Sequence, residues 1–297
     1  MIRPRPRFKQ TQSTGHSTFC LLNGPHIEWW PAQLTQAKKN LQARLIGQSQ
    51  WVLRRKLDRL ILASYGAEKV HYLCAHRDYS CEIQAGLALL RRLPSLTAPT
   101  SAVTVAQPLS QRTLMRRIGL DEQTYQRDRG LPRIAEPSQL YYAGRDRYQR
   151  PIWMTWVAGR AWQRMAAHAL QHHITLEVVS SYRSYDYQLG LIMQKLARAQ
   201  PLDAILRINA APGFSEHHSG CALDLSTPGT DAVSEHFEQT PAFQWLNQHA
   251  YRFGFSLSYP RNNPHGLIYE PWHWCWRPPK SVAAPVSIAA TMTQNSN

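Results

Sequence analysis

A proline-, serine- and threonine-rich run, PSLTAPTSAVTVAQPLS, most constrains how this chain of 297 residues can fold. Its composition is typical of a linker and not of a helix or strand. The chain is also longer than a typical single domain, which favours a main domain plus an additional segment. We therefore expect a linker over residues 95–112, an accessory segment before it, and the main domain over residues 113–280.

The part of the chain before the linker has two different patterns. Residues 1–30 mix proline, arginine and polar side chains without periodicity, which predicts a disordered arm. From Pro31 to Ala67, apolar residues recur at intervals of three and four with Lys and Arg between them, as on one face of a helix. A second helical pattern over residues 80–93 stops at Pro94. These patterns predict a helical accessory segment over residues 31–94.

The main domain shows both strand and helix patterns. The run SQLYYAGRDRYQRPIWMTW predicts two strands joined by a turn, and residues 158–172 predict a helix. Further on, ITLEVVSSYRS and CALDLS predict strands, residues 187–199 and 237–251 predict helices, and Pro271 interrupts the strand-like GLIYEPWHWCW. The predicted fold class is α+β, a small antiparallel sheet packed by helices. Residues 281–297 predict a disordered tail.

The chain is strongly basic, with 34 Lys and Arg against 19 Asp and Glu and a formal charge of +15. Such a balance attracts polyanions, including nucleic acid, anionic lipid surfaces and anionic wall polymers. The arginines are scattered from Arg3 to Arg277, and no zinc-finger, helix-turn-helix or RNA-binding signature accompanies them. The sequence therefore does not favour nucleic acid as the partner.

The cysteines and the amino-terminal region indicate the cellular compartment in which the protein is expected. The five cysteines form an odd set without CxxC spacing, which indicates neither a disulfide framework nor a Cys-rich zinc knuckle: Cys20, Cys74, Cys81, Cys221 and Cys275. The first 30 residues lack the apolar run of a signal peptide, and no stretch reaches the roughly 18 consecutive apolar residues of a membrane span. By sequence alone, we expect a cytoplasmic location and no transmembrane segment.

Two distant stretches carry residues suited to a metal site. The run PGFSEHHSGCALDL offers His217 and Asp224, and an imidazole with a carboxylate suits a divalent ion of the zinc type. Gly220 between them can turn the chain so that the two side chains converge. A catalytic zinc usually takes three protein ligands, and His273 in YEPWHW is the expected third. Glu270 would then serve as the general base.

Taken singly, each of these residues has an ordinary structural explanation. Any one of the 13 histidines is more often a surface or core residue than a ligand, and Asp224 alone could cap a strand end. Glu270 alone could be an exposed charge. Cys221 and Cys275 could bind metal as thiolates, but free cysteines are more often small buried residues. Only the combination of His217, Asp224, Glu270 and His273 indicates a function.

The same residues carry a resemblance to a known family. SEHHSGCALD matches the motif SxHxxGxAxD through five residues, namely Ser215, His217, Gly220, Ala222 and Asp224, and Glu270 precedes a WH pair as in a second motif. In both motifs the chain resembles the LAS metallopeptidases, named for lysostaphin, D-Ala-D-Ala peptidases and sonic hedgehog. PGxSEH, YEPWHW and SSYRSYDYQ are similar to the VanY-type D-alanyl-D-alanine carboxypeptidases, over about residues 115–277. Trp274 and Cys275 depart from the family, which often has an arginine soon after WH.

The resemblance implies roles for individual residues. It implies a zinc ion held by His217, Asp224 and His273, with Glu270 as the base. It further suggests that Arg183 grips the terminal carboxylate of the peptide, since a guanidinium fork fits a carboxylate, with Ser215 assisting and Gln188 near the pocket. The alternatives are a loop charge for Arg183, a turn or cap residue for Ser215 and a helix-surface amide for Gln188. Glu216 and His218 flank a ligand, but the motif skips both.

The expected function is zinc-dependent hydrolysis of the terminal D-Ala-D-Ala bond of peptidoglycan stem peptides. One alternative is an endolysin-like L-alanyl-D-glutamate endopeptidase of the same superfamily. Another is a non-catalytic cell-wall or zinc-binding module. A peptidoglycan substrate would place the protein in the periplasm or cell envelope, in conflict with the missing signal peptide. The sequence predicts no oligomeric state.

Overall fold

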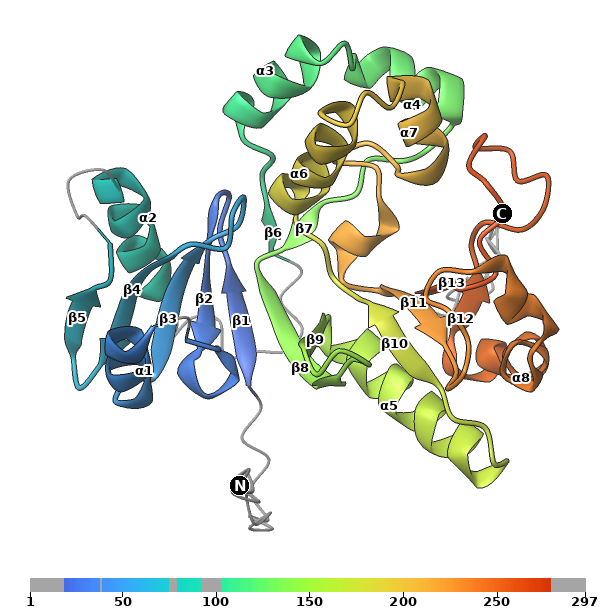
Figure 1. Ribbon diagram of the computed structural model, residues 1–297, viewed down its shortest axis with the longest axis horizontal. Helices are drawn as coiled ribbons and strands as arrows, with labels where there is room; N and C mark the ends of the chain where they lie inside the picture. The colour runs from blue at the N-terminus through green and yellow to red at the C-terminus, as the bar shows by residue number, and fades with distance from the viewer. Residues whose placement is uncertain (1–18, 38, 75–78, 92–102, 279–297) are drawn as a thin grey trace, which may run out of the picture.

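In the residues that the structure describes, three antiparallel sheets are packed by helices (Figure 1). The computed structural model describes residues 19–37, 39–74, 79–91 and 103–278. The largest sheet has seven strands in the order β5-β4-β3-β2-β1-β8-β9, and a four-stranded sheet has the order β10-β11-β13-β12. Strands β6 (Thr104–Val105) and β7 (Glu136–Pro137) form a third, short pair. The predicted α+β class with a small antiparallel sheet is confirmed.

The amino-terminal part is mainly β-structure. Its strands are β1 (Cys20–Asn23), β2 (Ile27–Pro31), β3 (Trp51–Arg55), β4 (Ile61–Gly66) and β5 (Lys69–Tyr72), and its helices are η1 (Ala32–Leu34), α1 (Asn40–Gly47) and α2 (Ser80–Leu90). Helix α2 packs on the sheet, where Trp29 donates a 2.7 Å hydrogen bond to the carbonyl of Gly86. A Cβ at Gly86 would lie 2.7 Å from Leu53, so only glycine allows this close packing.

The prediction of a helical segment over residues 31–94 is therefore wrong for most of its length, although α2 confirms the helix predicted over 80–93. The apolar spacing that suggested one or two helices begins in a real helix, α1, but continues through two strands, β3 and β4, and the turn between them. Both strands are buried on parts of both faces, which removes the polar and apolar alternation that would have indicated strands. The predicted disordered arm is wrong for β1 and β2, while residues 1–18 lie outside the described residues.

The large sheet crosses the predicted domain boundary. Strands β8 (Gln139–Arg145) and β9 (Pro151–Met154) come from the predicted main domain, and β8 pairs with β1 so that Cys20 faces Tyr141. Leu21, Leu140 and Trp153 are buried together across this junction. Within the predicted linker, β6 and the start of α3 (Leu109–Arg117) are regular structure, and residues 95–102 lie outside the described residues. The division into domains stays a prediction.

The remaining elements form two packed groups. One core joins α5 (Trp156–Gln171) and α8 (Pro241–His249) to strands β10 (Glu177–Ser180), β11 (Ala222–Ser226), β12 (Phe255–Leu257) and β13 (His273–Trp276). The other joins α3, α4 (Glu122–Arg129), α6 (Tyr185–Leu196) and α7 (Leu202–Ile208). The short helix η4 (Glu216–Ser219) precedes β11, and the short helices η5 (Glu235–Gln239) and η6 (Ala250–Phe253) flank α8. The helices predicted over 158–172 and 187–199 and the strand predicted for CALDLS are confirmed.

Local sequence signals explain where several of these helices begin. The hydroxyl of Ser184 accepts a hydrogen bond from the Tyr187 amide at the start of α6, and Thr240 caps α8 in the same way, ahead of Pro241 in its first turn. The start of α6 thereby fixes the loop 181–184 that leads into it from β10. Among the helices of the described residues, none has the length and apolarity needed to cross a bilayer.

Candidate metal centre

The two distant motifs meet on neighbouring strands. Strands β11 and β13 pair so that Asp224 lies directly opposite His273, which places their side chains next to each other on one face. His217 lies in η4, which is followed by Gly220 with a φ of 67° before the chain enters β11. A Cβ at Gly220 would also collide with Leu140. Glycine is therefore required at the turn that brings His217 back to Asp224.

His217, Asp224 and His273 form a compact buried group. One ligand atom from each residue lies within 4.8 Å of the others. The Oδ1 atom of Asp224 is 3.2 Å from Nε2 of His217 and 3.1 Å from Nδ1 of His273. Two imidazoles and one carboxylate are the donor set of many catalytic zinc sites, so these residues fit such an ion.

The other nitrogen of each imidazole is held by a protein acceptor. Nδ1 of His217 donates to the carbonyl oxygen of Ser181 over 2.7 Å, and Nε2 of His273 lies 2.9 Å from Oε2 of Glu216. These contacts fix the orientation of both rings and leave His217 Nε2 and His273 Nδ1 facing Asp224. The same arrangement of an anchored imidazole is usual for histidines that bind metals.

The electrostatics of the group suit a cation. Burial, and then the charge of Arg183, lower the pKa of His217 to about 4, so this imidazole is neutral at pH 7. Burial opposes the charge of Asp224, but His217, His273 and Arg183 outweigh it and hold the pKa of Asp224 well below its usual value. Burial likewise opposes the charge of His273, but the carboxylates of Asp224 and Glu216 raise its pKa to about 10. A metal ion would replace the proton that these carboxylates retain on His273.

Glu270 lies beside this group without joining it. Its Oε2 atom is 3.7 Å from Nδ1 of His273, and the residue is 8% exposed. Burial raises the pKa of Glu270 to about 7, partly offset by the nearby positive charge of His273. A buried carboxyl group with a pKa near neutrality, next to a candidate metal site, has the properties of a general base.

The three predicted substrate-binding residues differ in their surroundings. Arg183 follows β10, and its Nη2 atom is 3.3 Å from Oδ2 of Asp224, so it borders the metal group. Gln188 is 1% exposed, and its amide donates a 2.7 Å hydrogen bond to the carbonyl of Ala210. Ser215 is 5% exposed at the start of η4. The geometry brings Arg183 to the centre, and the substrate roles of all three stay predictions.

Glu216 contacts the centre although the sequence motif skips it. Besides the contact with His273, its Oε1 atom accepts a 2.6 Å hydrogen bond from Arg277. Burial opposes its charge, but the hydrogen bond and charge of His273 lower the pKa of Glu216 to about 2. Nothing in the spacing distinguished Glu216 from a surface residue, because its partner is 57 positions away along the chain.

Neither nearby cysteine belongs to the metal group in the described part of the chain. Cys275 is buried on β13, and Cys221 precedes β11 with its sulfur 3.5 Å from the hydroxyl of Thr155. Burial raises the pKa of both thiols, which disfavours the thiolate form that binds metals.

Known proteins resemble the part of the chain that holds the candidate metal centre. Residues 152–279 match the VanY family, described as D-alanyl-D-alanine carboxypeptidase. The putative carboxypeptidase YodJ of Bacillus subtilis (strain 168) is 36% identical over 101 residues, which are 33% of this chain and 37% of that protein. A D-alanyl-D-alanine carboxypeptidase of Enterococcus faecium is 29% identical over 125 residues, 41% of this chain and 37% of that protein.

The chain thus covers a little over a third of the length of these curated relatives. Among solved structures, the LdcB LD-carboxypeptidase is 30% identical over 45% of this chain and 64% of that one, with a TM-score of 0.41. The sequence match covers both motifs and the loop that carries Arg183. The matched region, residues 152–279, which we call the VanY-type domain after the family that it resembles, contains every member of the candidate metal centre.

Proposed function

We propose that the protein is a zinc-dependent D-alanyl-D-alanine carboxypeptidase that removes the terminal D-alanine from peptidoglycan stem peptides. The observation that carries this proposal is the position of Glu270, a buried carboxyl group with a raised pKa, beside the group of His217, Asp224 and His273. The match to the VanY family and the names of the curated relatives support the same activity.

Three residues would hold the zinc ion, through Nε2 of His217, the carboxylate of Asp224 and Nδ1 of His273. Zinc bound there would polarise the scissile carbonyl and lower the pKa of the attacking water. The carbonyl of Ser181 and the carboxylate of Glu216 keep the two imidazoles in the orientation that this requires.

Glu270 would move the proton. As a carboxylate it accepts a proton from the attacking water, and as a carboxylic acid it returns that proton to the amine of the leaving D-alanine. A pKa of about 7 allows both roles near neutral pH. Its buried position keeps bulk water from competing for the proton.

Arg183 would recognise the free carboxylate that distinguishes a carboxypeptidase substrate. Asp224 contacts one of its terminal nitrogens, Nη2, and the buried Nε atom has no acceptor among the described residues. A guanidinium group can therefore still donate to a peptide carboxylate. Ser215 and Gln188 stay candidates for further contacts with the same group.

The activity is tested with a soluble pentapeptide that ends in D-Ala-D-Ala. The wild-type protein should release free D-alanine, a chelator should stop the release, and added zinc should restore it. Replacing Glu270→Gln should abolish turnover while zinc content stays the same, and Glu235→Gln, a surface change of the same kind, should leave both intact. Undiminished release by Glu270→Gln would refute its role as base.

Product analysis also separates the endopeptidase alternative. Cleavage between L-alanine and D-glutamate would yield a shorter peptide and no free D-alanine. A non-catalytic zinc-binding module would retain zinc and release neither product.

A further inference from the structure

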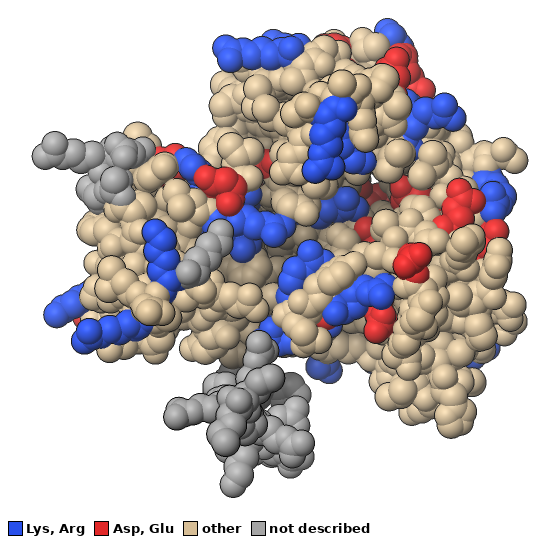
Figure 2. All heavy atoms as spheres, viewed as in Figure 1, with Lys and Arg blue, Asp and Glu red and all other residues tan. Residues whose placement is uncertain are grey.

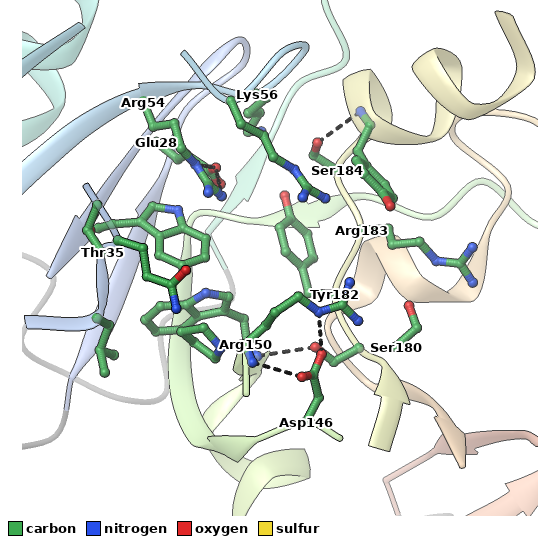
Figure 3. A pocket seen from close by; sticks show the side chains of 18 of the residues that line it. Glu28, Thr35, Arg54, Lys56, Asp146, Arg150, Ser180, Tyr182, Arg183 and Ser184 are labelled. Carbon is green, nitrogen blue, oxygen red and sulfur yellow. Dashed lines mark hydrogen bonds and ion pairs between the residues drawn. The ribbon is translucent and has the colours of Figure 1, made fainter. Parts of the chain in front are cut away.

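A pocket, which we call the junction pocket, lies between the amino-terminal strands and the VanY-type domain (Figure 3). Strands β2 to β4 line one side, and the β8–β9 turn with the loop after β10 lines the other. Its volume is about 410 Å³, which is within the usual range of small-molecule sites. Residues 28–61 contribute one wall, and these lie well outside the region that matches the VanY family.

The junction pocket carries an excess of positive charge. Six cationic side chains line it: Arg54, Lys56, Arg59, Arg145, Arg150 and Arg183. Four of them form ion pairs, namely Arg54 with Glu28, Lys56 with Glu136, Arg150 with Asp146 and Arg183 with Asp224. Within the described ranges, Arg59 and Arg145 have no carboxylate within 4.0 Å. Figure 2 shows blue side chains gathered in the hollow between the two parts of the molecule.

The buried polar atoms of the junction pocket that lack partners are all hydrogen-bond donors. They are Nε1 of Trp30 and Nε1 of Trp153, each without an acceptor among the described residues, and Nε of Arg183, whose side chain extends toward Asp224 and is not part of this proposal. Trp153 is only 3% exposed, and its ring meets that of Trp30 edge to face at 5.1 Å. Among the described residues the lining has spare donors and no spare buried acceptor, which suits a ligand group that only accepts hydrogen bonds.

The backbone of Arg59 adds an independent observation. It has a φ of 60° in the turn between β3 and β4, a conformation in which glycine is favoured over an L side chain. Its guanidinium group lies 4.6 Å from the ring centroid of Tyr187, which reaches it from α6 across the junction. Because strained backbone positions cluster at functional sites, Arg59 is a candidate contact for a ligand at the rim of the pocket.

We propose that the junction pocket binds a small molecule that carries oxyanion groups, either carboxylate or phosphate. Arg59 and Arg145 supply the charge at the mouth, and the indole N–H groups of Trp30 and Trp153 supply neutral donors deeper in. Aromatic side chains of the lining, such as Tyr182, can pack against the uncharged part of such a molecule. Carboxylate and phosphate oxygens accept hydrogen bonds and donate none, which matches the lining.

The junction pocket and the metal centre share one loop. Tyr182 faces the pocket and donates a 2.8 Å hydrogen bond to Glu136, whereas Arg183 extends to the other side of the loop, toward Asp224 (Figure 3). The neighbouring carbonyl of Ser181 holds His217. The pocket is complete without the metal ligands, so the proposal does not depend on the carboxypeptidase activity.

Calorimetric titration of the full chain at near-physiological salt tests the proposal with two separate probes. Inorganic pyrophosphate represents a phosphate source, and the dipeptide L-alanyl-D-glutamate represents a carboxylate source without a D-Ala-D-Ala bond. At least one probe should bind, and Arg145→Gln should weaken that binding about tenfold or more, because it removes one charge-assisted contact. Arg164→Gln, the same charge change on the exposed face of α5, should leave binding unchanged.

Arg59→Gly separates binding from folding. Glycine fits the backbone at φ 60°, so the melting temperature should be unchanged or higher while binding falls as in Arg145→Gln. A probe bound at the metal centre would not respond to either change. The proposal is overturned if neither probe binds, if both pocket variants bind like the wild type, or if Arg164→Gln weakens binding as much as they do. D-alanine release is assayed separately. If the protein releases no D-alanine, the binding titrations still test the junction pocket on their own.

Discussion

Two buried carboxylates, Glu136 and Asp224, occupy opposite sides of the loop 181–184, and their partners differ in kind. Glu136 is fully buried and accepts hydrogen bonds from Lys56, Asn23, Tyr182 and the amide of Tyr185, at 2.5 to 3.0 Å. Asp224 is also buried, but its main partners are two imidazoles and one guanidinium group. Both carboxylates are buried, so burial alone does not indicate which of the two belongs to a functional site.

The two carboxylates differ in whether their partners can lose a proton and bind a cation instead. Lys56, Asn23 and the two tyrosines remain donors at neutral pH, and they come from strands and loops on both sides of the junction. They saturate Glu136 and tie the amino-terminal sheet to the VanY-type domain. The imidazoles around Asp224 can instead lose a proton and offer a lone pair to a cation. We therefore interpret Glu136 as a structural anchor and Asp224 as a metal ligand.

The largest expected effect comes from two adjacent histidines with different partners. His217 faces Asp224, whereas His218 is also buried but contacts the carbonyl of Arg183 at 2.7 Å and the ring of Tyr185. His217→Ala should lower zinc affinity by more than the roughly 10–100-fold loss that is typical of residues which only orient a metal ligand. His218→Ala should retain zinc, as measured by metal analysis after dialysis. Equal losses of zinc in both variants would contradict the distinction between Asp224 as a metal ligand and Glu136 as a structural anchor.

The second effect concerns the anchor itself. Lys56→Met leaves the charge of Glu136 buried without its cation, which should lower the free energy of unfolding by about 3–5 kcal/mol. The matched surface change Asp128→Asn removes an exposed pair with Arg127 and should cost less than about 1 kcal/mol. Urea denaturation followed by circular dichroism measures both. A cost for Lys56→Met no larger than the surface change would show that the cluster is not an anchor.

A smaller effect is expected for the residue that orients His273. Glu216→Gln keeps an acceptor near Nε2 but removes the negative charge, so zinc affinity should fall about 10–100-fold. Competition with a chelator of known affinity measures this change. Glu238→Gln, a surface change of the same type, provides the control, and an unchanged affinity in Glu216→Gln would exclude an orienting role.

The smallest expected effect is a change in the free energy of unfolding at low pH. Burial opposes the charge of Glu136, but Lys56 and His218 outweigh it and lower its pKa below the unfolded value of 4.5. A lowered pKa stabilises the fold above pH 4.5, and that contribution is lost as pH falls through the lowered value. The stability difference between wild type and Glu136→Gln should therefore shrink below pH 4.5. A difference that grows in acid would contradict this sign.

The sequence predicted the metal group better than the fold around it, for physical reasons. His217 and Asp224 lie on either side of Gly220, whose left-handed φ is a property that a sequence reveals. Glu270 and His273 also lie close together in the sequence, within the short motif YEPWHW. The roles of these residues stay predictions, but their meeting in space follows from short-range signals and one strand pairing.

The amino-terminal sheet could not be predicted in the same way. Leu53, Leu57 and Leu60 have helical spacing, yet Leu53 lies in β3 and the other two in the following turn. Pairing of β1 with β8 joins residues about 120 positions apart, which no local pattern encodes. The contact of Glu216 with His273 and the junction pocket were missed for the same reason.

The central claim is that His217, Asp224 and His273 bind one zinc ion together, and anomalous diffraction at the zinc edge of crystals grown with zinc tests it most directly. We predict one strong peak at about 2.0–2.2 Å from His217 Nε2, Asp224 and His273 Nδ1, with Glu270 not coordinated. A zinc peak elsewhere, or none between these three side chains at full zinc loading, would contradict the account.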